Sequence, residues 1–428
     1  MQDLVTWSKS PDRKPLVLRG ARQVGKTWLL KEFGSKEFVN TAYVNCQRDK
    51  SAQSIFSGDL DPSTILRGLE IATQSRIIPG ETLVIIDEIQ EAPYALTSLK
   101  YFQEEIPELH VAAAGSLLGV ATQSLKSFPV GKVNFLDLYP LDFEEFLRGI
   151  NESALANSVR EREWPIIKNF KIRLTELLKL YLFIGGMPEP VYSYSQGATL
   201  ETVRSIQTDI VHGYENDFAK YTTSVESRRI NEVWRSLPSQ LAKENRRFIL
   251  SKVREGARGR EYEGAIQWLV NAGLVYKVNL MTKPGQPPRA FENTSIFKLF
   301  ALDVGLLGAQ SELNAEIILN GHQVFEEFKG ALTEQYVLQQ LISLTNGVPM
   351  YWSRSSENAR AEIDFVISNQ HGLVPIEVKS SENVRSKSLR SYINTYKPQL
   401  AIRCSLRDHI VQDDLTNIPL YAITALVQ

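Results

Sequence analysis

The sequence predicts an α/β protein of several domains, the first of which is a doubly wound parallel sheet. The chain has 428 residues, more than one hydrophobic core usually supports. Before residue 140, short β-rich apolar runs alternate with longer mixed segments, the rhythm of strands joined by crossover helices. The runs are nearly continuous in apolar character, which indicates strands covered on both faces. The expected strands are Leu16–Leu18, Ala42–Val44, Leu83–Ile86, Val111–Ala114 and Val133–Leu136.

The bulk composition narrows the class of protein. Hydrophobic residues make up 43% and charged residues 23% of the chain, as in globular proteins. A formal net charge of -1 excludes a general attraction to nucleic acid or anionic membranes, so a surface for such a partner would be local. The sequence shows no signal-peptide pattern and no long uncharged apolar run, and Cys46 and Cys404 lie far apart. We expect no membrane anchor, no structural zinc and a cytoplasmic location.

A phosphate-binding loop follows the first expected strand. The segment Gly20-Ala21-Arg22-Gln23-Val24-Gly25-Lys26-Thr27 fits the pattern G-x-x-x-x-G-K-[ST], and Trp28 opens the apolar start of a helix. Glycines let backbone amides wrap a phosphate, the lysine reaches the β- and γ-phosphate oxygens, and the threonine hydroxyl suits magnesium. The sequence therefore predicts ATP and Mg2+ as cofactors, bound by the segment from this first glycine to the tryptophan.

A second motif indicates hydrolysis. The strand Leu83–Ile86 leads into Asp87 and Glu88. In P-loop enzymes the first acid holds magnesium and the second polarises the attacking water, so Asp87 and Thr27 are expected metal ligands and Glu88 the catalytic base. An acidic pair after a strand is otherwise a solvated turn. Ser116 follows the next expected strand and is a candidate sensor of the γ-phosphate, or an ordinary turn residue.

A complete hydrolase of this class also uses an arginine finger, which stabilises charge on the transferring phosphoryl group. A finger from a neighbouring subunit would make activity depend on a homo-oligomer. The sequence offers candidates without choosing among them: Arg148, Arg228, Arg229, Arg258 and Arg260.

The middle region is expected at residues 151–310, after a first domain of residues 1–150, and it has helical periodicity. Gly185-Gly186-Met187-Pro188 interrupts it as a turn. A helix at Ala265–Asn271 precedes a hairpin built on Leu274–Leu280 with its tip at Pro284–Pro288, which suggests a winged helix.

The same region holds a locally basic window. Lys243 to Arg260 contain seven Lys or Arg against two Glu. Such a surface suits sequence-independent contacts with DNA phosphates. A solvated helix face, or ion pairs within the protein, is the alternative.

The C-terminal region, residues 311–428, is expected to contain a helix from about Phe325 that carries Glu334. Asp364 is expected at the start of a strand, which a turn at Asn369–Gly372 connects to the next strand. That next strand carries Glu377 and Lys379.

These four polar residues have the E…D…E-x-K order of restriction-endonuclease-like nucleases. Because alternate strand residues share a face, Glu377 and Lys379 would point the same way. Asp364 and Glu377 would hold a metal ion beside a scissile phosphate. Lys379 would orient or activate water and stabilise developing charge, and Glu334 would complete the metal shell or hold its water. The alternative is an ion-paired cluster in an inactive domain that mediates contacts.

Motifs of one known family occur along the chain at Gly20–Thr27, Ile86–Gln90, Gly115–Ser116, Phe128–Lys132, Tyr139–Phe146, Gly185–Glu189, Phe297–Phe300 and Asp303–Leu307. Together they resemble the bacterial and archaeal AAA-like P-loop ATPases that carry a C-terminal domain of unknown function. The resemblance covers nearly the whole chain and implies an ATP-binding protein whose C-terminal domain is similar to PD-(D/E)xK nucleases.

Three functions follow as hypotheses. The first is an ATPase with a nuclease-like domain that acts on DNA under ATP control. The second is a nucleotide-dependent switch or adaptor whose nuclease-like domain is inactive and binds a protein partner. The third is a motor that remodels protein or DNA in an oligomeric ring.

Overall fold

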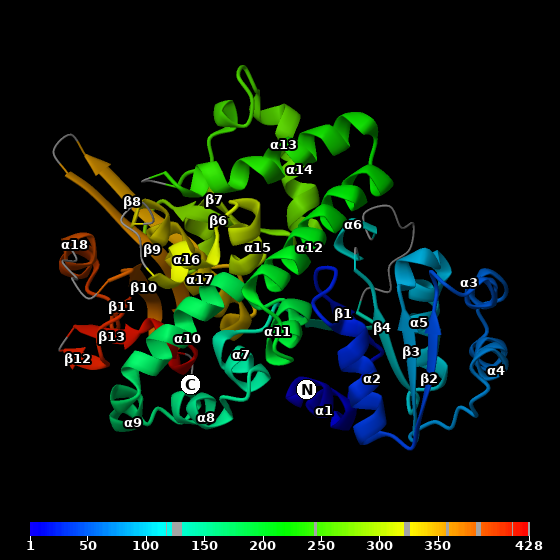
Figure 1. The fold of residues 1–428 in the computed structure, drawn as a ribbon. Coiled ribbons are helices and arrows are strands. Elements are labelled where there is room, and N and C mark those ends of the chain that lie inside the picture. Colours follow the sequence, from blue (N-terminus) through cyan, green and yellow to red (C-terminus); the bar gives the residue numbers. More distant parts are fainter. Residues whose placement is uncertain are drawn as a thin grey trace. The chain divides into compact units, whose positions relative to one another are not determined.

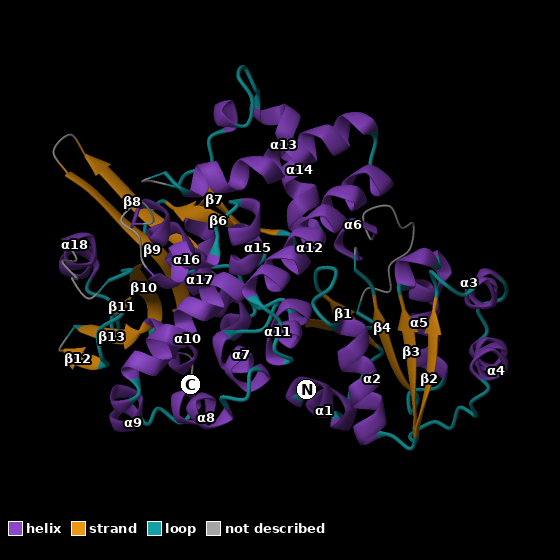
Figure 2. Cartoon of the chain, viewed as in Figure 1, coloured by secondary structure: helices purple, strands orange, loops and turns teal. Residues whose placement is uncertain are grey.

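The computed structural model describes residues 1–116, 118–121, 131–243, 246–320, 326–356, 359–381, 387–412 and 414–426. The chain divides into two compact units. The first unit comprises Met1–Tyr139 with Asn271–Gly273, and the second comprises Pro140–Val270 with Leu274–Gln428. Figures 1 and 2 show the elements of each.

The first unit is built on a parallel sheet in the order β2-β3-β4-β1-β5, which confirms the predicted doubly wound fold. Its strands coincide with the five expected apolar runs: β1 (Leu16–Arg19), β2 (Asn40–Asn45), β3 (Thr82–Asp87), β4 (His110–Ala114) and β5 (Asn134–Asp137). Its helices are α1 (Gln2–Lys9), α2 (Lys26–Glu37), α3 (Lys50–Ser57), α4 (Pro62–Thr73), α5 (Pro93–Glu105) and α6 (Leu118–Ala121), with the short 3-10 helix η1 (Ile89–Glu91).

Helices cover both faces of this sheet, as Figure 1 shows. Strand side chains alternate between faces, so Leu83 and Ile85 pack with residues of α1 and α2, whereas Val84 and Ile86 pack with residues of α3, α4 and α5. Burying each such side chain stabilises the fold by roughly 1.5–3 kcal/mol. The arrangement leaves the carboxyl ends of the strands as the place where polar groups converge.

The second unit begins with helices, as expected from the periodicity, and the predicted Gly-Gly-Met-Pro turn separates α10 from α11. Its helices are α7 (Phe143–Gly149), α8 (Ser153–Arg160), α9 (Trp164–Asn169), α10 (Lys171–Ile184), α11 (Pro188–Ser195), α12 (Leu200–Tyr221), α13 (Ser224–Leu241), α14 (Gly259–Asn271), α15 (Val304–Gln310), α16 (Ala315–Asn320), α17 (Glu326–Thr345) and α18 (Lys387–Tyr396). Shorter 3-10 helices are η2 (Leu250–Lys252), η3 (Pro288–Phe291) and η5 (Leu420–Leu426).

A second, mixed sheet in the order β12-β13-β11-β10-β9-β8-β6-β7 completes this unit. The expected hairpin is confirmed as β6 and β7, but β6 also pairs in parallel with β8, so the hairpin continues into the large sheet. The winged helix and the restriction-endonuclease-like fold therefore stay predictions. The strands are β6 (Val275–Met281), β7 (Glu292–Ala301), β8 (Met350–Ser356), β9 (Ala359–Asn369), β10 (Gly372–Val378), β11 (Ile402–Ser405), β12 (Ile410–Gln412) and β13 (Leu415–Pro419).

Two details of the C-terminal prediction were wrong. Asp364 lies inside β9 rather than at its start, because β9 begins at Ala359 as the second strand of a hairpin with β8. Lys379 lies one residue beyond β10, although its amide still bonds Cys404 O of β11 at 2.8 Å. Phe325 and Phe128 to Val130 lie outside the described residues, and the expected boundaries at 150 and 310 stay predictions.

Candidate functional site

Lys26 is the first residue of α2 and is almost fully buried in the phosphate loop. Its Nζ donates hydrogen bonds to Gly20 O at 2.9 Å and Ala21 O at 2.7 Å. Burial lowers the Lys26 pKa to about 8, against the opposing effect of the Glu88 and Asp87 carboxylates. The amine therefore lies near its charged–neutral transition and is held by carbonyls with which phosphate oxygens would compete.

The loop backbone has the conformations that its glycines allow. Gly20 and Gly25 have φ of 149° and 95°, and a Cβ at Gly20 would collide with Leu138 O. Of the other predicted nucleotide-binding residues, Ala21 and Val24 are buried, whereas Arg22 and Gln23 are exposed. The Trp28 side chain is also exposed, with 67% of its surface accessible.

Asp87 ends β3 and is the meeting point of three polar groups. Its Oδ2 accepts hydrogen bonds from Thr27 Oγ1 at 2.9 Å, Tyr43 OH at 2.9 Å and Asn45 Nδ2 at 3.3 Å. Sequence reasoning missed Tyr43 and Asn45, which lie on β2 beside β3. Two polar residues spaced by two near the end of a strand were the available signal, but only the strand order shows which acid they contact.

The Glu88 carboxylate has other hydrogen-bond partners than the Asp87 carboxylate. Its Oε2 accepts hydrogen bonds from Gln90 Nε2 at 2.5 Å and Ser116 Oγ at 3.2 Å. Its backbone is in the left-handed region, with φ of 49°, a strained conformation that gathers at functional sites. Because β4 lies between β3 and β1, Ser116 reaches Glu88 from the centre of the sheet. Gln90 was not foreseen as a partner.

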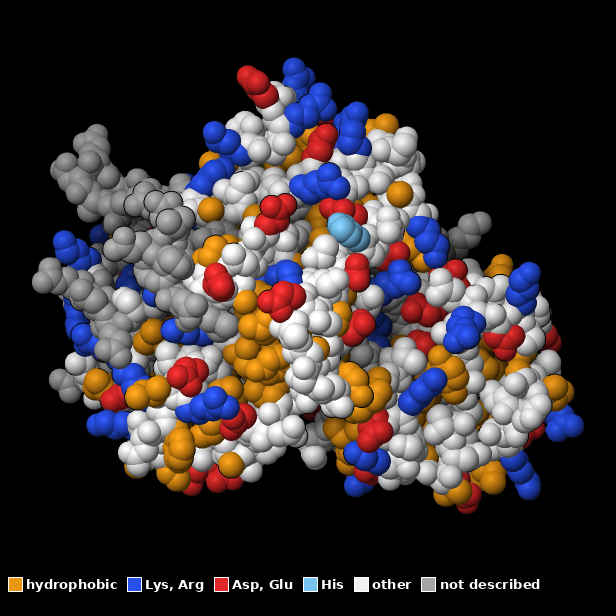
Figure 3. Space-filling model, viewed as in Figure 1, with side chains coloured by type: hydrophobic (Ala, Val, Ile, Leu, Met, Phe, Trp, Pro, Cys, Tyr) orange, Lys and Arg blue, Asp and Glu red, His pale blue; other side chains and the backbone are white. Residues whose placement is uncertain are grey.

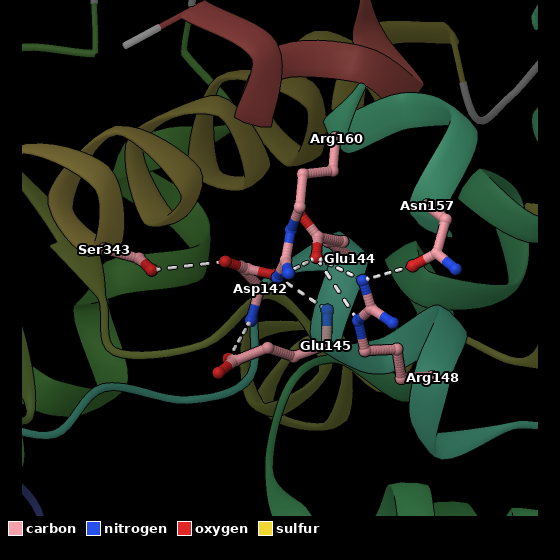
Figure 4. Close-up of polar contacts among 7 residues, drawn as sticks. All are labelled: Asp142, Glu144, Glu145, Arg148, Asn157, Arg160 and Ser343. Atoms are coloured by element: carbon pink, nitrogen blue, oxygen red, sulfur yellow. Dashed lines mark hydrogen bonds and ion pairs between the residues drawn. The ribbon is translucent and has the colours of Figure 1, made fainter. Parts of the chain in front are cut away.

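The arginine candidates all belong to the second unit, and Arg148 is held there (Figure 4). Its Nη2 bonds Glu144 Oε1 at 3.0 Å and Asn157 Oδ1 at 2.8 Å, while Arg160 pairs with the same glutamate at 2.5 Å. Arg148 would have to leave these partners to act as a finger. The other candidates lie on α13 and α14 or just before α14: Arg228 and Arg229 are within 4 Å of acids, and Arg258 and Arg260 are exposed.

The basic window divides into inward-facing and exposed cations. Arg246 pairs with Glu334, and Arg247 Nη2 bonds Ser353 Oγ at 3.2 Å. Figure 3 shows Lys and Arg side chains gathering over α13 and α14. The exposed members of the window are Lys252, Arg254, Arg258 and Arg260.

The structure brings the four C-terminal residues of the predicted nuclease constellation together. Asp364 Oδ2 accepts a hydrogen bond from Val378 N at 2.8 Å, and Lys379 Nζ lies 2.8 Å from Glu377 Oε1. Burial and the Glu334 carboxylate raise the pKa of Asp364 well above its usual range. Burial opposes ionisation of Glu334 too, but Arg246, Lys298 and a hydrogen bond with Asp364 outweigh it and lower the Glu334 pKa. Burial thus favours the neutral form of Asp364, whereas the neighbouring cations favour the ionised form of Glu334.

A residue absent from the prediction, Lys298, occupies the centre of this cluster. It projects from β7, is completely buried, and its Nζ lies 2.7 Å from Glu362 Oε1 and 3.9 Å from Glu334 Oε2. Burial disfavours the ammonium, yet the two glutamates raise the Lys298 pKa above its usual value. A single lysine inside the apolar run of β7 was the sequence signal for a buried charge.

The two sites differ in the groups that surround their oxygens. Thr27 Oγ1 and Asp87 Oδ2 are adjacent hard oxygens, and magnesium commonly takes one or two protein ligands beside phosphates and water. In the second unit, Arg246 pairs with Glu334, Lys298 with Glu362 and Lys379 with Glu377. The metal ligands expected there, Asp364 and Glu377, stay a prediction. Across the described residues, no three His, Cys, Asp or Glu side chains are grouped to hold a metal.

Family comparisons assign the first region. A family described as an AAA domain matches residues 12–147. The chain carries an AAA-type P-loop ATPase domain at its N-terminus. The corresponding part of the resemblance is thereby confirmed. Two further families match residues 175–317 and 329–423, and both are described only as domains of unknown function, DUF8612 and DUF4143. The nuclease-like part of the resemblance stays a prediction.

Solved structures give distant likenesses. A Walker-type ATPase of Pyrococcus abyssi is 14% identical, with 72% of this chain and 95% of that chain covered and a TM-score of 0.47. The RuvB Holliday junction branch migration motor of Thermotoga maritima is 14% identical over 65% and 88% of the chains, with a TM-score of 0.29. A structure of Drosophila ORC bound to AT-rich DNA and Cdc6 is 14% identical, with 73% of this chain and 88% of that chain covered and a TM-score of 0.23. These scores carry no functional argument. No curated protein matches the chain.

Among the described residues, no helix combines the length and the apolar character needed to cross a membrane.

Proposed function

We propose that the first unit binds ATP and hydrolyses it with magnesium. The observation that carries this proposal is the separation of two adjacent acids: Asp87 is bonded to Thr27, whereas Glu88 is held by Gln90 and Ser116. Thr27 and Asp87 would hold the metal ion, which supplies charge neutralisation at the phosphates. Glu88 would accept the proton of the attacking water, and Lys26 would bind the β- and γ-phosphates.

The test measures nucleotide binding and phosphate release separately. Lys26→Ala should weaken binding of a fluorescent ATP analogue, because it removes the buried cation of the loop. Glu88→Gln should bind the analogue as the unaltered protein does, while phosphate release falls by a factor on the order of a hundred or more. Loss of binding in Glu88→Gln would contradict the role proposed for this residue.

For the second unit we infer the adaptor hypothesis: its carboxylate cluster stabilises a domain that binds a protein partner according to nucleotide state. The supporting observation is that Arg246 pairs with Glu334 and Lys298 with Glu362, so buried cations of the protein already compensate two acids of the cluster. An ATP-controlled nuclease is the competing proposal. Magnesium- or manganese-dependent cleavage of DNA or RNA by the intact protein, lost in both Asp364→Ala and Lys379→Ala, would establish the nuclease instead.

DNA remains a proposed partner of the exposed basic residues Lys252, Arg254, Arg258 and Arg260. If these four side chains each contact a phosphate, the logarithm of duplex affinity should fall against the logarithm of salt concentration with a slope of about -3.6. The quadruple Ala variant should lose that dependence. Duplex binding of equal strength and slope in that variant would remove DNA binding from this surface. A homo-oligomer and a cytoplasmic, reducing location also stay proposals; both cysteines are free and buried.

A further inference from the structure

We propose that Tyr181 and Gln340 of the second unit are positioning residues for the ATP site, acting on the phosphate loop through the backbone that joins Leu138 to Leu141. This inference rests on the proposed ATPase function and adds residues from outside the phosphate loop. Three features, taken in chain order, carry it: a set of contacts in each unit and the short connection between them.

The first set ties Leu138 to the phosphate loop inside the first unit. Leu138 N donates a hydrogen bond to Arg19 O at 2.8 Å, which extends the pairing of β5 with β1. Leu138 O lies against Gly20, where any side chain would collide with it. Gly20 O in turn accepts a hydrogen bond from Lys26 Nζ at 2.9 Å. A displacement of Leu138 would therefore move Gly20, which is the first residue of the phosphate loop and accepts the hydrogen bond from Lys26.

The second feature is the connection from Leu138 to Leu141, which consists of Tyr139 and Pro140; the chain also passes between the units on either side of Asn271–Gly273. Proline has a fixed φ and no amide hydrogen, and the residue before it is confined to extended conformations. Tyr139 and Pro140 thus have little freedom to absorb a change in distance between Leu138 and Leu141. Flexible linkers between domains have the opposite composition, rich in glycine and serine.

The third set, which we term the Leu141 anchor, comprises Leu141, Phe143, Tyr181, Gly186 and Gln340. Leu141 N donates to Gly186 O at 2.7 Å, and Tyr181 OH donates to Leu141 O at 2.5 Å. Phe143 N donates to Gln340 Oε1 at 2.7 Å. Tyr181 and Gln340 are completely buried, so these bonds are shielded from competing water.

The anchor is fixed to the rest of the second unit by a buried carboxylate. Asp303 Oδ2 accepts hydrogen bonds from Gly186 N at 2.6 Å and Gln339 Nε2 at 2.9 Å. Gln339 Nε2 also bonds Tyr181 OH at 2.9 Å. A third contact from α17, Ser343 Oγ to Asp142 Oδ2 at 3.5 Å, is visible in Figure 4. Because α17 carries Gln339, Gln340, Ser343 and Glu334, the helix that holds the anchor also reaches the carboxylate cluster.

The test compares two glutamines of α17 that differ in what they hold. Gln340 bonds Phe143 N of the anchor, whereas Gln335 is equally buried but bonds Ala301 N and O of β7. Gln340→Leu should raise the dissociation constant of a fluorescent ATP analogue about fivefold, the order expected for the loss of one buried hydrogen bond. Gln335→Leu should lower the thermal stability about as much as Gln340→Leu does, but it should leave the dissociation constant of the ATP analogue unchanged.

A second variant leaves both units intact. Two glycines inserted between Tyr139 and Pro140 should weaken ATP-analogue binding as Gln340→Leu does. Coupling between sites is reciprocal, so ATP should slow hydrogen exchange at the Leu141 and Phe143 amides of the unaltered protein, and fail to do so in the insertion variant.

Each outcome is decisive. Equal ATP affinity in the unaltered protein, Gln340→Leu and the insertion variant overturns the inference and leaves the proposed ATPase in place, as does an equal loss of affinity in Gln335→Leu. Failure of the unaltered protein to bind the analogue overturns the ATPase proposal and this inference with it.

Discussion

The phosphate-loop site and the C-terminal carboxylate cluster both gather acids and lysines, but they balance charge in opposite ways. In the first unit, Asp87 is bonded to neutral donors, and Lys26 is held by backbone carbonyls. In the second, Lys298 and Arg246 pair with carboxylates directly. Lys26 has a lowered pKa and Lys298 a raised one, which expresses the same contrast.

The phosphate-loop site would therefore be stabilised by a bound ligand, whereas carboxylates of the C-terminal cluster are already paired with cations of the protein. Phosphates and magnesium would compensate the charges of the phosphate loop, whereas Lys298 and Arg246 already pair with carboxylates of the C-terminal cluster. Buried ion pairs cost desolvation and are strongly destabilising to break. We therefore expect ligand-dependent effects in the first unit and stability effects in the second.

The largest expected effect is on the stability of the second unit. Lys298→Met leaves Glu334 and Glu362 without their shared cation and should lower the free energy of unfolding by about 3–5 kcal/mol. Chemical denaturation followed by tryptophan fluorescence measures it. Lys277→Met on the neighbouring strand β6 is the matched control, since that half-buried lysine lies over the Phe297 ring instead. A Lys298→Met protein as stable as the control would show that the cluster does not depend on this cation.

The opposite pKa shifts of Asp364 and Glu334 predict a difference between these two acids of the cluster. Asp364→Asn mimics the protonated acid and should cost about 1 kcal/mol at neutral pH, whereas Glu334→Gln removes an ionised partner of Arg246 and should cost about 3 kcal/mol. Denaturant titrations of both variants at pH 7 measure this. The reverse order of stabilities would show that Glu334, rather than Asp364, is the neutral acid.

A smaller effect concerns the pH dependence of ATP binding. The Lys26 pKa is lowered to about 8, so the amine becomes neutral in the free protein above that pH. ATP affinity should fall by about tenfold per pH unit above pH 8, because phosphate binds the charged amine. The folding linkage has the opposite sign: between this pKa and the ordinary value of 10.5 the unfolded chain binds more protons, so the contribution of Lys26 to stability rises with pH.

Isothermal titration between pH 7 and pH 9 measures the affinity change. Lys26→Arg keeps its charge over this range and serves as the control. A flat profile for the unaltered protein would show that Lys26 stays charged in the free loop.

The smallest effect is on magnesium. Tyr43→Phe removes one of the donors that orient Asp87 and should raise the magnesium concentration for half-maximal ATPase activity about tenfold, at the low end for residues that support metal ligands. Tyr94→Phe, an exposed change in the same unit, should have no effect. Unchanged magnesium dependence in Tyr43→Phe would leave that tyrosine a structural role only.

The nucleotide site could be predicted largely from sequence because its residues follow strands whose order the fold class implies. Lys26, Thr27, Asp87 and Glu88 are local features of a loop and a strand end. Their partners Tyr43 and Gln90 were missed, since contacts across strands and into a 3-10 helix have no local signature. The bounds of the strands near the C-terminal carboxylate cluster were harder to predict, because polar residues fill the start of β9.

Lys298 shows a stronger limit of sequence reasoning. In β7 it is a single lysine inside an apolar run, a pattern that signals a buried charge but does not show which acids neutralise it. Its burial depends on acids from β9 and α17, more than thirty positions away along the chain in each case. Pairing of buried charges over such separations is a property of the tertiary fold.

The placement of α7 determines how this protein can be divided into fragments. Phe143 and Phe146 are buried and make edge-to-face ring contacts with Tyr181, and both belong to the second unit. A fragment that ends at the expected boundary of residue 150 would keep α7 and expose these rings, an apolar surface that promotes aggregation. A fragment that ends at Tyr139 leaves the helix with its aromatic partners but lacks Asn271–Gly273, the other segment of the first unit, so recombinant dissection has to supply both segments.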